Sequence, residues 1–370
     1  QESATQLGGF LATVAAGASA FYLGAKFFQA GYPRKPLLRG SYQEVGSRVA
    51  VYGGIRCRCF YPASAAKGEE GQYLTEGTQT SDAMARLVFF PGFLLEHLGA
   101  VTSGCFQNAP ATAGGHPLLV YSHGQGGNMD MAAYFMRQIA SFGVVVVALE
   151  HQDGSSSNAD PENPRRFNLA EGQLGVQYRA KEVVRVAQAL KQEPRLAELL
   201  GADSASMLVG GHSYGGPTAI YAAAAHPELF RGLVLHDPAL GGRLPTPPLP
   251  IFSVVGDQYA AIPSLAEEVK RISANSNSNP WAGAWHYVGS SHGNFVDAGL
   301  WAPLWIMRLL GLLLIPAAGP AEPSEIHERL AAAAAAFASA CCNNNSNNNS
   351  NSNKVEGAGW TLPGAPFEPL

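Results

Sequence analysis

The sequence predicts an α/β protein with a mainly parallel central sheet that helices cover on both faces. Between residues 117 and 290, short apolar runs alternate with segments of helical periodicity, and parallel strands need such helical crossovers. Runs such as VVVVALEH are apolar without interruption, as expected of strands buried on both faces. Hydrophobic residues make up 46% of the chain and charged residues 14%, which excludes a disordered chain or a coiled coil.

The expected elements follow one another along the chain. Two strands are predicted between residues 45 and 62, and a third at 117–124 ends in turn residues. The periodicity then predicts a helix over 129–143, a strand over 144–151 and a long helix over 170–193. The remaining elements are a strand at 206–213 with an Ala-rich helix after it, strands at 232–238 and 250–257, a helix at 264–275 and a last strand at 285–290.

The folded body is expected to be one domain over residues 38–316, with atypical segments on both sides. Residues 1–37 form an apolar N-terminal segment, and residues 317–370 form an Ala-rich and Asn/Ser-rich low-complexity tail. The run NNNSNNNSNSN at 343–353 cannot bury a core, so disorder is predicted there.

Three interpretations of the N-terminal segment stay open. Residues 3–25 carry no charge, and Ala18-Ser19-Ala20 matches a signal-peptide cleavage pattern. The same stretch is long enough for a membrane anchor, and the third interpretation is a buried or amphipathic helix. The first two interpretations predict a secreted or membrane-associated protein.

Charge and cysteine content exclude some partners and cofactors. The net charge of −4 and the pI of about 6.2 do not match a nucleic-acid binder. The five cysteines fit no zinc pattern, and Cys57 and Cys59 alternate along a predicted strand, where ordinary packing is expected. His123 has no second ligand at metal spacing, so neither a metal nor a cofactor is predicted.

The motif Gly211-His212-Ser213-Tyr214-Gly215 predicts a catalytic nucleophile. It follows a predicted buried strand and opens a helix of small residues, which is the strand–turn–helix context of a nucleophile elbow. The glycines allow close approach of strand and helix, and the tight turn presents the Ser213 hydroxyl above the sheet. His212 should point away from the nucleophile and have a structural role.

A serine needs a base, and the base needs an acid. In nucleophile-elbow hydrolases the chain order is serine, acid, histidine, so His292, in the loop after the last strand, is the predicted base. His286 lies inside that strand, and His327 lies in a separate helix. Asp237 and Asp257 each end a strand at a suitable place, and spacing alone slightly favours Asp257.

The segment SHGQGGN at 122–128 is the candidate oxyanion hole. It ends a predicted strand and precedes a helix, so its Gly-flanked turn can aim a backbone N–H at a developing oxyanion. The amide of Gln125 is the first expected donor, and the amide of Tyr214, next to the nucleophile, is the second.

These segments together resemble the platelet-activating factor acetylhydrolases of the plasma and cytosolic type II group, which are α/β-hydrolase lipases. The resemblance covers residues 38–316 and rests on GSYQEVG, IRCRCFYPAS, HPLLVYSHGQGG, FGVVVVALEHQDGSSS, GGHSYGG and GSSHGNFVD, in that order. It implies the α/β-hydrolase fold, with Ser213 as nucleophile and His292 as base. It also implies Gln125 and Tyr214 as oxyanion donors.

The resemblance changes the choice of acid. The family places its acid after the strand that follows the nucleophile helix, which favours Asp237 over Asp257. The family often reads Leu-Asp there, whereas this chain reads Leu-His-Asp, a one-residue shift that puts His236 at the family's acid position. Gln125 stands where the family usually has an apolar residue, a difference that could change pocket polarity and leave a backbone donor intact.

The function implied by the resemblance is a calcium-independent serine esterase. It would remove the short sn-2 acyl group of platelet-activating factor or of an oxidised phospholipid at a membrane or lipoprotein surface. The alternatives are a general short-chain carboxylesterase or polyester hydrolase, and a non-catalytic binding protein of the same fold. The sequence leaves the oligomeric state open.

Overall fold

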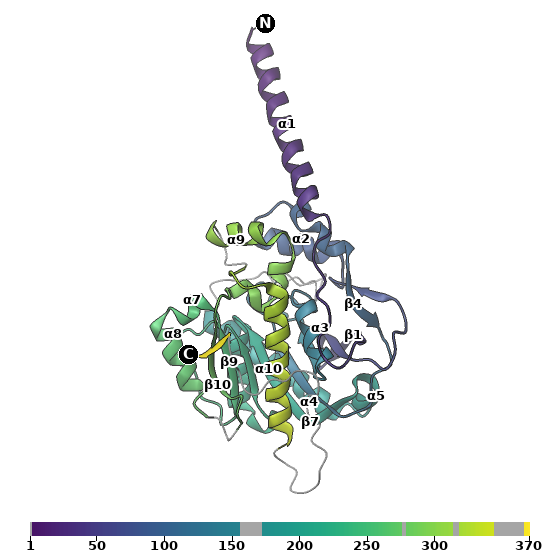
Figure 1. The fold of residues 1–370 in the computed structure, drawn as a ribbon, viewed down its shortest axis with the longest axis vertical. Helices are drawn as coiled ribbons and strands as arrows, with labels where there is room; N and C mark the ends of the chain where they lie inside the picture. The colour runs from purple at the N-terminus through teal and green to yellow at the C-terminus, as the bar shows by residue number, and fades with distance from the viewer. Residues whose placement is uncertain (1, 156–171, 276–278, 314–317, 344–365) are drawn as a thin grey trace.

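One large sheet forms the centre of the molecule (Figure 1). The computed structural model describes residues 2–155, 172–275, 279–313, 318–343 and 366–370. Within these residues the sheet has eleven strands in the order β11-β10-β9-β8-β7-β5-β6-β2-β1-β4-β3. The strands are β1 (Val45–Tyr52), β2 (Ile55–Pro62), β3 (Glu70–Gln72), β4 (Thr102–Gln107), β5 (His116–Ser122), β6 (Val145–Leu149), β7 (Ala202–His212), β8 (Leu233–His236), β9 (Ile251–Val255), β10 (Gly283–Tyr287) and β11 (Phe367–Pro369).

The central part of the sheet is parallel. Strand β5 pairs with β6 and β7, and the parallel pairing continues through β8 and β9 to β10. The outer pairs β1–β2, β2–β6, β3–β4 and β10–β11 are antiparallel, and β1–β4 is parallel. The predicted mainly parallel sheet is therefore confirmed, and its parallel strands place their carboxyl ends, with the loops that follow them, along one edge.

Helices cover the sheet on both faces and bury two apolar cores. One core includes side chains of α3 (Ala133–Ser141) and α10 (Pro323–Asn343), and the other includes side chains of α4 (Gly172–Gln192) and α6 (Gly215–Ala225). The remaining helices are α1 (Glu2–Gln29), α2 (Thr78–Leu87), α5 (Leu196–Leu200), α7 (Asp257–Ala260), α8 (Pro263–Ile272) and α9 (Leu304–Leu313), with 3-10 turns η1 (Gly92–Leu94), η2 (Glu96–Ala100), η4 (Pro227–Leu229), η5 (His292–Phe295) and η6 (Asp297–Leu300).

The helix predicted over 129–143 begins later in the structure, at Ala133. The side-chain oxygen of Asn128 accepts a hydrogen bond from the backbone N–H of Asp130 at 2.9 Å. This local turn competes with helix formation, because a short polar side chain offers the backbone another partner.

The sequence predicts that the domain ends at residue 316, but in the structure the domain continues beyond it. Helix α10 crosses the front of the sheet in Figure 1 and contacts α3. Its side chains Ile326, Leu330 and Phe337 are buried, and β11 adds an edge strand beside β10. The run of alanines at 331–336 is the surface along which α10 packs closely, since small side chains allow two elements to approach. The predicted disorder at 343–353 lies almost entirely outside the described residues, because only Asn343 is described, at the end of α10.

Helix α1 projects away from the body (Figure 1). Most side chains between residues 14 and 28 are exposed, so this part of the helix is not buried in the core. Its last turns contact the body, where the rings of Phe21 and Tyr22 lie 5.8 and 5.2 Å from the ring of Phe93. Among the described helices, none combines the length and the hydropathy that a membrane span requires.

Candidate active site

The predicted nucleophile lies in a strained turn between β7 and α6. Ser213 has a φ of 55°, a left-handed conformation that is rare for a residue other than glycine. A Cβ added to Gly211 would lie 2.3 Å from the carbonyl oxygen of Gly215, and one added to Gly215 would lie 2.0 Å from that of Ser122. Only glycine fits at both positions, so this sequence permits the sharp turn that leaves Ser213 partly exposed.

Asp237 and His292 meet although 55 residues separate them. The Nδ1 atom of His292 donates a hydrogen bond to Oδ2 of Asp237 at 2.5 Å, and the other carboxylate oxygen accepts from the backbone N–H of Gly256 at 2.8 Å. Asp237 is 1% exposed, whereas the side chain of His292 is 19% exposed. The acid is thus held inside the protein while the histidine reaches the surface of the site.

Asp257, the other candidate acid, belongs to a different cluster. Its Oδ1 atom accepts from Nε2 of His286 at 2.8 Å and from the backbone N–H of Gly289 at 3.0 Å. The structure therefore pairs the predicted base with Asp237, in agreement with the family resemblance and against the preference from spacing alone.

Two rings pack near the His292 imidazole. The ring of His212 is centred 4.5 Å away, and that of Tyr259, from α7, is 5.2 Å away. The Nε2 atom of His212 donates to the backbone oxygen of His292 at 3.1 Å, which ties the histidine loop to the residue before the nucleophile. Burial and then the nearby His292 hold the pKa of His212 well below its usual range, so His212 stays neutral. This is the structural role expected for His212.

The oxyanion segment lies against the nucleophile. A Cβ added to Gly124 would lie 3.2 Å from the Cβ of Ser213, so this backbone passes directly beside the serine. Gln125 follows with an exposed side chain, and Tyr214 begins the turn into α6. The two residues expected to supply amide donors are thus on the two loops that meet at Ser213.

His123 has a structural role in this loop. Its Nδ1 atom donates to the backbone oxygen of Gly124 at 2.8 Å, and its Nε2 atom lies 3.4 Å from the backbone N–H of His151. Burial and then the charge of Arg179 hold its pKa well below the usual value, which keeps the ring neutral. Among the described residues, no group of three or more His, Cys, Asp or Glu side chains is arranged to hold a metal ion.

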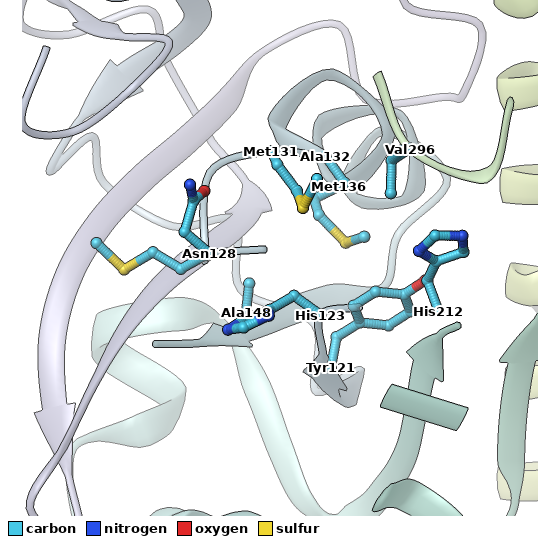
Figure 2. Close-up of a pocket in the computed structure, with 10 residues that line it drawn as sticks. Tyr121, His123, Asn128, Met131, Ala132, Met136, Ala148, His212 and Val296 are labelled. Atoms are coloured by element: carbon cyan, nitrogen blue, oxygen red, sulfur yellow. The ribbon is translucent and has the colours of Figure 1, made fainter. Parts of the chain in front are cut away.

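A small cavity lies between the oxyanion loop and His212 (Figure 2). The thioethers of Met131 and Met136 line one side, and the rings of Tyr121 and His212 line the other. Methionine is flexible and polarisable, so this wall can adapt to an apolar group next to the site.

One buried polar chain was not predicted from the sequence. The hydroxyl of Ser122 lies 2.7 Å from Nε2 of His151, whose Nδ1 atom lies 2.6 Å from a carboxylate oxygen of Glu182. Burial raises the pKa of Glu182 to about 7. The three residues lie on β5, after β6 and on α4, so no local sequence motif predicts their contact. The only sequence signal was the run of polar residues EHQD directly after a buried strand.

Comparisons with known proteins show the family of the chain. The family model of platelet-activating factor acetylhydrolase, isoform II, matches residues 50–196 and 179–362. A platelet-activating factor acetylhydrolase of Canis lupus familiaris is 26% identical over 239 residues, which cover 54% of this chain and 52% of the relative. The match therefore spans about half the length of that relative.

A solved structure shows the same fold. The ferulic acid esterase of Streptomyces cinnamoneus superimposes with a TM-score of 0.57 at 17% identity, covering 80% of this chain and 89% of the esterase. Together with the mainly parallel sheet, this likeness confirms the α/β-hydrolase fold. Because the family model matches most of the sequence, the chain belongs to the family of platelet-activating factor acetylhydrolase, isoform II.

Proposed function

We propose that the protein is a serine ester hydrolase whose triad is Ser213, Asp237 and His292. The observation that carries the proposal is the hydrogen bond from His292 to the buried Asp237, beside a serine in the left-handed conformation of a nucleophile elbow. The non-catalytic alternative is disfavoured because such a binding protein has no need for both a strained serine turn and a histidine paired with a buried acid.

In this proposal His292 acts as general base through Nε2, because its Nδ1 proton is committed to Asp237. The Ser213 hydroxyl loses its proton to that nitrogen and attacks the ester carbonyl. The amides of Gln125 and Tyr214 stabilise the oxyanion, and His292 returns the proton to the leaving alcohol. Water then hydrolyses the acyl-enzyme by the same steps, and no metal takes part.

We propose a phospholipid with a short sn-2 acyl group, such as platelet-activating factor or an oxidised phospholipid, as the substrate. Family membership supports this class, as does the named activity of the canine relative. The exposed polar Gln125 in the oxyanion loop favours the second candidate, a general short-chain carboxylesterase acting on soluble esters.

Labelling with a fluorophosphonate tests the assignment of Ser213. We expect Ser213→Ala to lose the label and on the order of 10⁶ in kcat without unfolding, because the nucleophile carries the reaction. Ser253→Ala is the matched control, since this buried β9 serine has a hydroxyl without a hydrogen-bond partner. A Ser213→Ala protein that keeps more than a few per cent of the activity would refute the assignment.

Comparing two substrates tests the proposed substrate class. We expect kcat/KM for an sn-2 acetyl phospholipid to exceed that for a soluble aryl acetate, and neither rate to change with EDTA. A marked preference for the aryl ester would support the general carboxylesterase. Loss of turnover in EDTA, restored by calcium or zinc, would contradict the proposed chemistry.

We also propose that the protein is secreted or membrane-associated and meets its substrate at a lipid surface. Exposed aromatic side chains on α1 and α9 support this. The Phe28 and Trp305 rings lie 5.5 Å apart, so these two helices contribute to one apolar surface.

A further inference from the structure

Arg179 is a fully buried arginine beneath the candidate oxyanion hole. It comes from α4 and is 0% exposed. Its Nη1 atom donates to the backbone oxygen of His123 at 2.8 Å and lies 3.5 Å from that of Gly124. On its other side, the guanidinium carbon lies 5.0 Å from the centre of the Tyr214 ring.

The same side chain also joins the loop after β6. Its Nε atom donates to Asp153 at 2.6 Å, and its Nη2 atom donates to the hydroxyl of Ser155 at 2.9 Å. The loops that follow β5, β6 and β7 are thus all in contact with one guanidinium, and these three strands are neighbours in the sheet.

We propose that Arg179 is a positioning residue that holds the two backbone segments of the oxyanion hole in register around Ser213. The inference rests on the proposed serine-hydrolase function and assigns a role to a side chain outside the triad.

The planarity of the peptide bond gives the physical reason. The carbonyl of Gly124 and the N–H of Gln125 belong to one trans peptide, so fixing the oxygen fixes the direction of the N–H. That oxygen accepts from Nδ1 of His123 at 2.8 Å and from the backbone N–H of Gly127 at 3.1 Å, with Arg179 3.5 Å away. The Gln125 donor is therefore held before a substrate arrives, as electrostatic stabilisation of an oxyanion requires.

The second donor is held through ring packing. Tyr214 lies between Ser213 and α6, and the guanidinium carbon of Arg179 lies over its ring. An arginine can stack on an aromatic face while its N–H groups bind carbonyl oxygens, whereas lysine has neither the planar fork nor the five donors. One arginine therefore sets the distance between the two donor loops.

Because Arg179 is paired with a carboxylate, its role is to orient backbone groups and not to supply net positive charge. Asp153 neutralises the guanidinium, and although burial opposes its ionisation, the nearby Arg179 holds the pKa of Asp153 below its usual range. The neutral His123 beside the pair adds no charge. The net effect of the cluster on the reacting oxygen is therefore orientation of N–H groups, and little net charge reaches the site.

The experiment compares Arg179→Lys and Arg179→Met with Arg137→Met in the full chain. Arg137 is the matched control because it too is buried and donates to backbone oxygens, those of Gly104 and Pro36, away from the oxyanion loop. The readouts are kcat and KM on an aryl acetate, the inhibition constant of a trifluoromethyl ketone transition-state analogue, and the melting temperature.

We expect both Arg179 variants to lose ~10–100-fold in kcat with little change in KM, and to bind the ketone more weakly by a similar factor. The pH midpoint of kcat/KM should stay in place, because His292 and Asp237 are untouched. Arg137→Met should lower the melting temperature and leave both kinetic readouts at wild-type values.

Arg179→Lys decides the outcome if Arg179→Met does not fold, because lysine keeps the charge opposite Asp153. An Arg179→Lys protein with wild-type kcat and ketone affinity would overturn the positioning role. A loss of kcat that Arg137→Met shares would also overturn it, as a mere effect of stability. A wild-type protein that neither takes a fluorophosphonate nor hydrolyses the ester would instead refute the proposed function.

Discussion

At the scale of single residues, the candidate site concentrates backbone strain at two strand ends. Ser213 and Asp237 have φ values of 55° and 45°, and they follow the neighbouring strands β7 and β8. The N–H of Ser213 donates to the oxygen of His236 at 3.2 Å, and that of Asp237 donates to the oxygen of Val254 at 2.7 Å. Hydrogen bonds to the adjacent strand thus hold both residues in conformations that cost free energy on their own.

The acid can be tested by comparing two aspartates. We expect Asp237→Asn to lower kcat by about 10⁴, because an amide still accepts from Gly256 but faces His292 with a donor and favours the wrong tautomer. Asp257→Asn, the matched control, should stay within a few-fold of wild type, since Asp257 binds His286 instead. Steady-state kinetics measures kcat for both variants. Equal losses of kcat would make Asp257 a candidate acid again.

The buried side chain of His236 predicts that the protein becomes less stable as pH falls. Burial lowers the pKa of His236 from 6.5 to about 3, so between these values only the unfolded chain binds this proton. The free energy of unfolding then decreases as pH falls, by about 1.4 kcal/mol per pH unit for this group. His236→Asn should make the slope between pH 4 and 6 shallower by about that amount in denaturant titrations, and parallel slopes would contradict it.

At the scale of elements, α10 shows how a segment of simple composition becomes part of a core. Its Phe337 is 0% exposed and its ring is centred 5.9 Å from that of Phe252 on β9. The alanines before it bring the helix close to the sheet, and the large side chains fill the remaining space. Helix α10 therefore stabilises the strands that carry Asp237 and Gly256.

This packing predicts a large cost for truncating one side chain. We expect Phe337→Ala to lower the free energy of unfolding by about 3–5 kcal/mol, because it removes buried aromatic area and leaves a cavity. Glu325→Gln, on an exposed position of the same helix, should change it by less than about 0.5 kcal/mol. Urea denaturation measures both, and similar small effects would mean that α10 is not part of the cooperative core.

At the scale of the whole molecule, the parallel sheet brings distant loops to one edge. The loops after β5, β6, β7, β8 and β10 contribute the candidate oxyanion segment, the partners of Arg179, and the proposed nucleophile, acid and base. The C-terminal part of α1 is also attached to the body, because a salt bridge between Lys26 and Glu96 joins α1 to η2. The exposed apolar side chains of α1 and α9 then lie on one part of the surface.

That surface predicts binding to lipid. We expect Leu23→Glu with Phe27→Glu, at positions 65% and 76% exposed on α1, to lose cosedimentation with phosphatidylcholine vesicles and to keep full activity on a soluble ester. Trp305→Glu with Leu309→Glu tests α9 in the same way, and Val51→Glu on β1 is the control. Undiminished binding by both double variants would contradict attachment through this surface.

Much of the fold and the site could be predicted from the sequence, because the signals are local. Apolar runs of strand length, the glycines around Ser213 and the turn at Gln125 are readable within a few residues. Family resemblance added Asp237, which spacing alone did not select. The early strands β3 and β4 and helix α2 were missed, because short elements carry little periodicity. A helix around His327 was expected, but the alanine run gave no signal that this helix, α10, packs into the core.

The sequence by itself therefore determined the α/β alternation, the tight turn at Ser213 and the place of His292 in the loop after the last parallel strand, since each depends on backbone preferences of neighbouring residues. Only the tertiary structure decided which aspartate meets His292, where α10 packs and what holds the oxyanion loop. Those outcomes depend on contacts between residues far apart in the chain, such as Asp237 with His292 and Arg179 with His123. Burial decides them, because a buried charge or donor must find a partner wherever the fold places one.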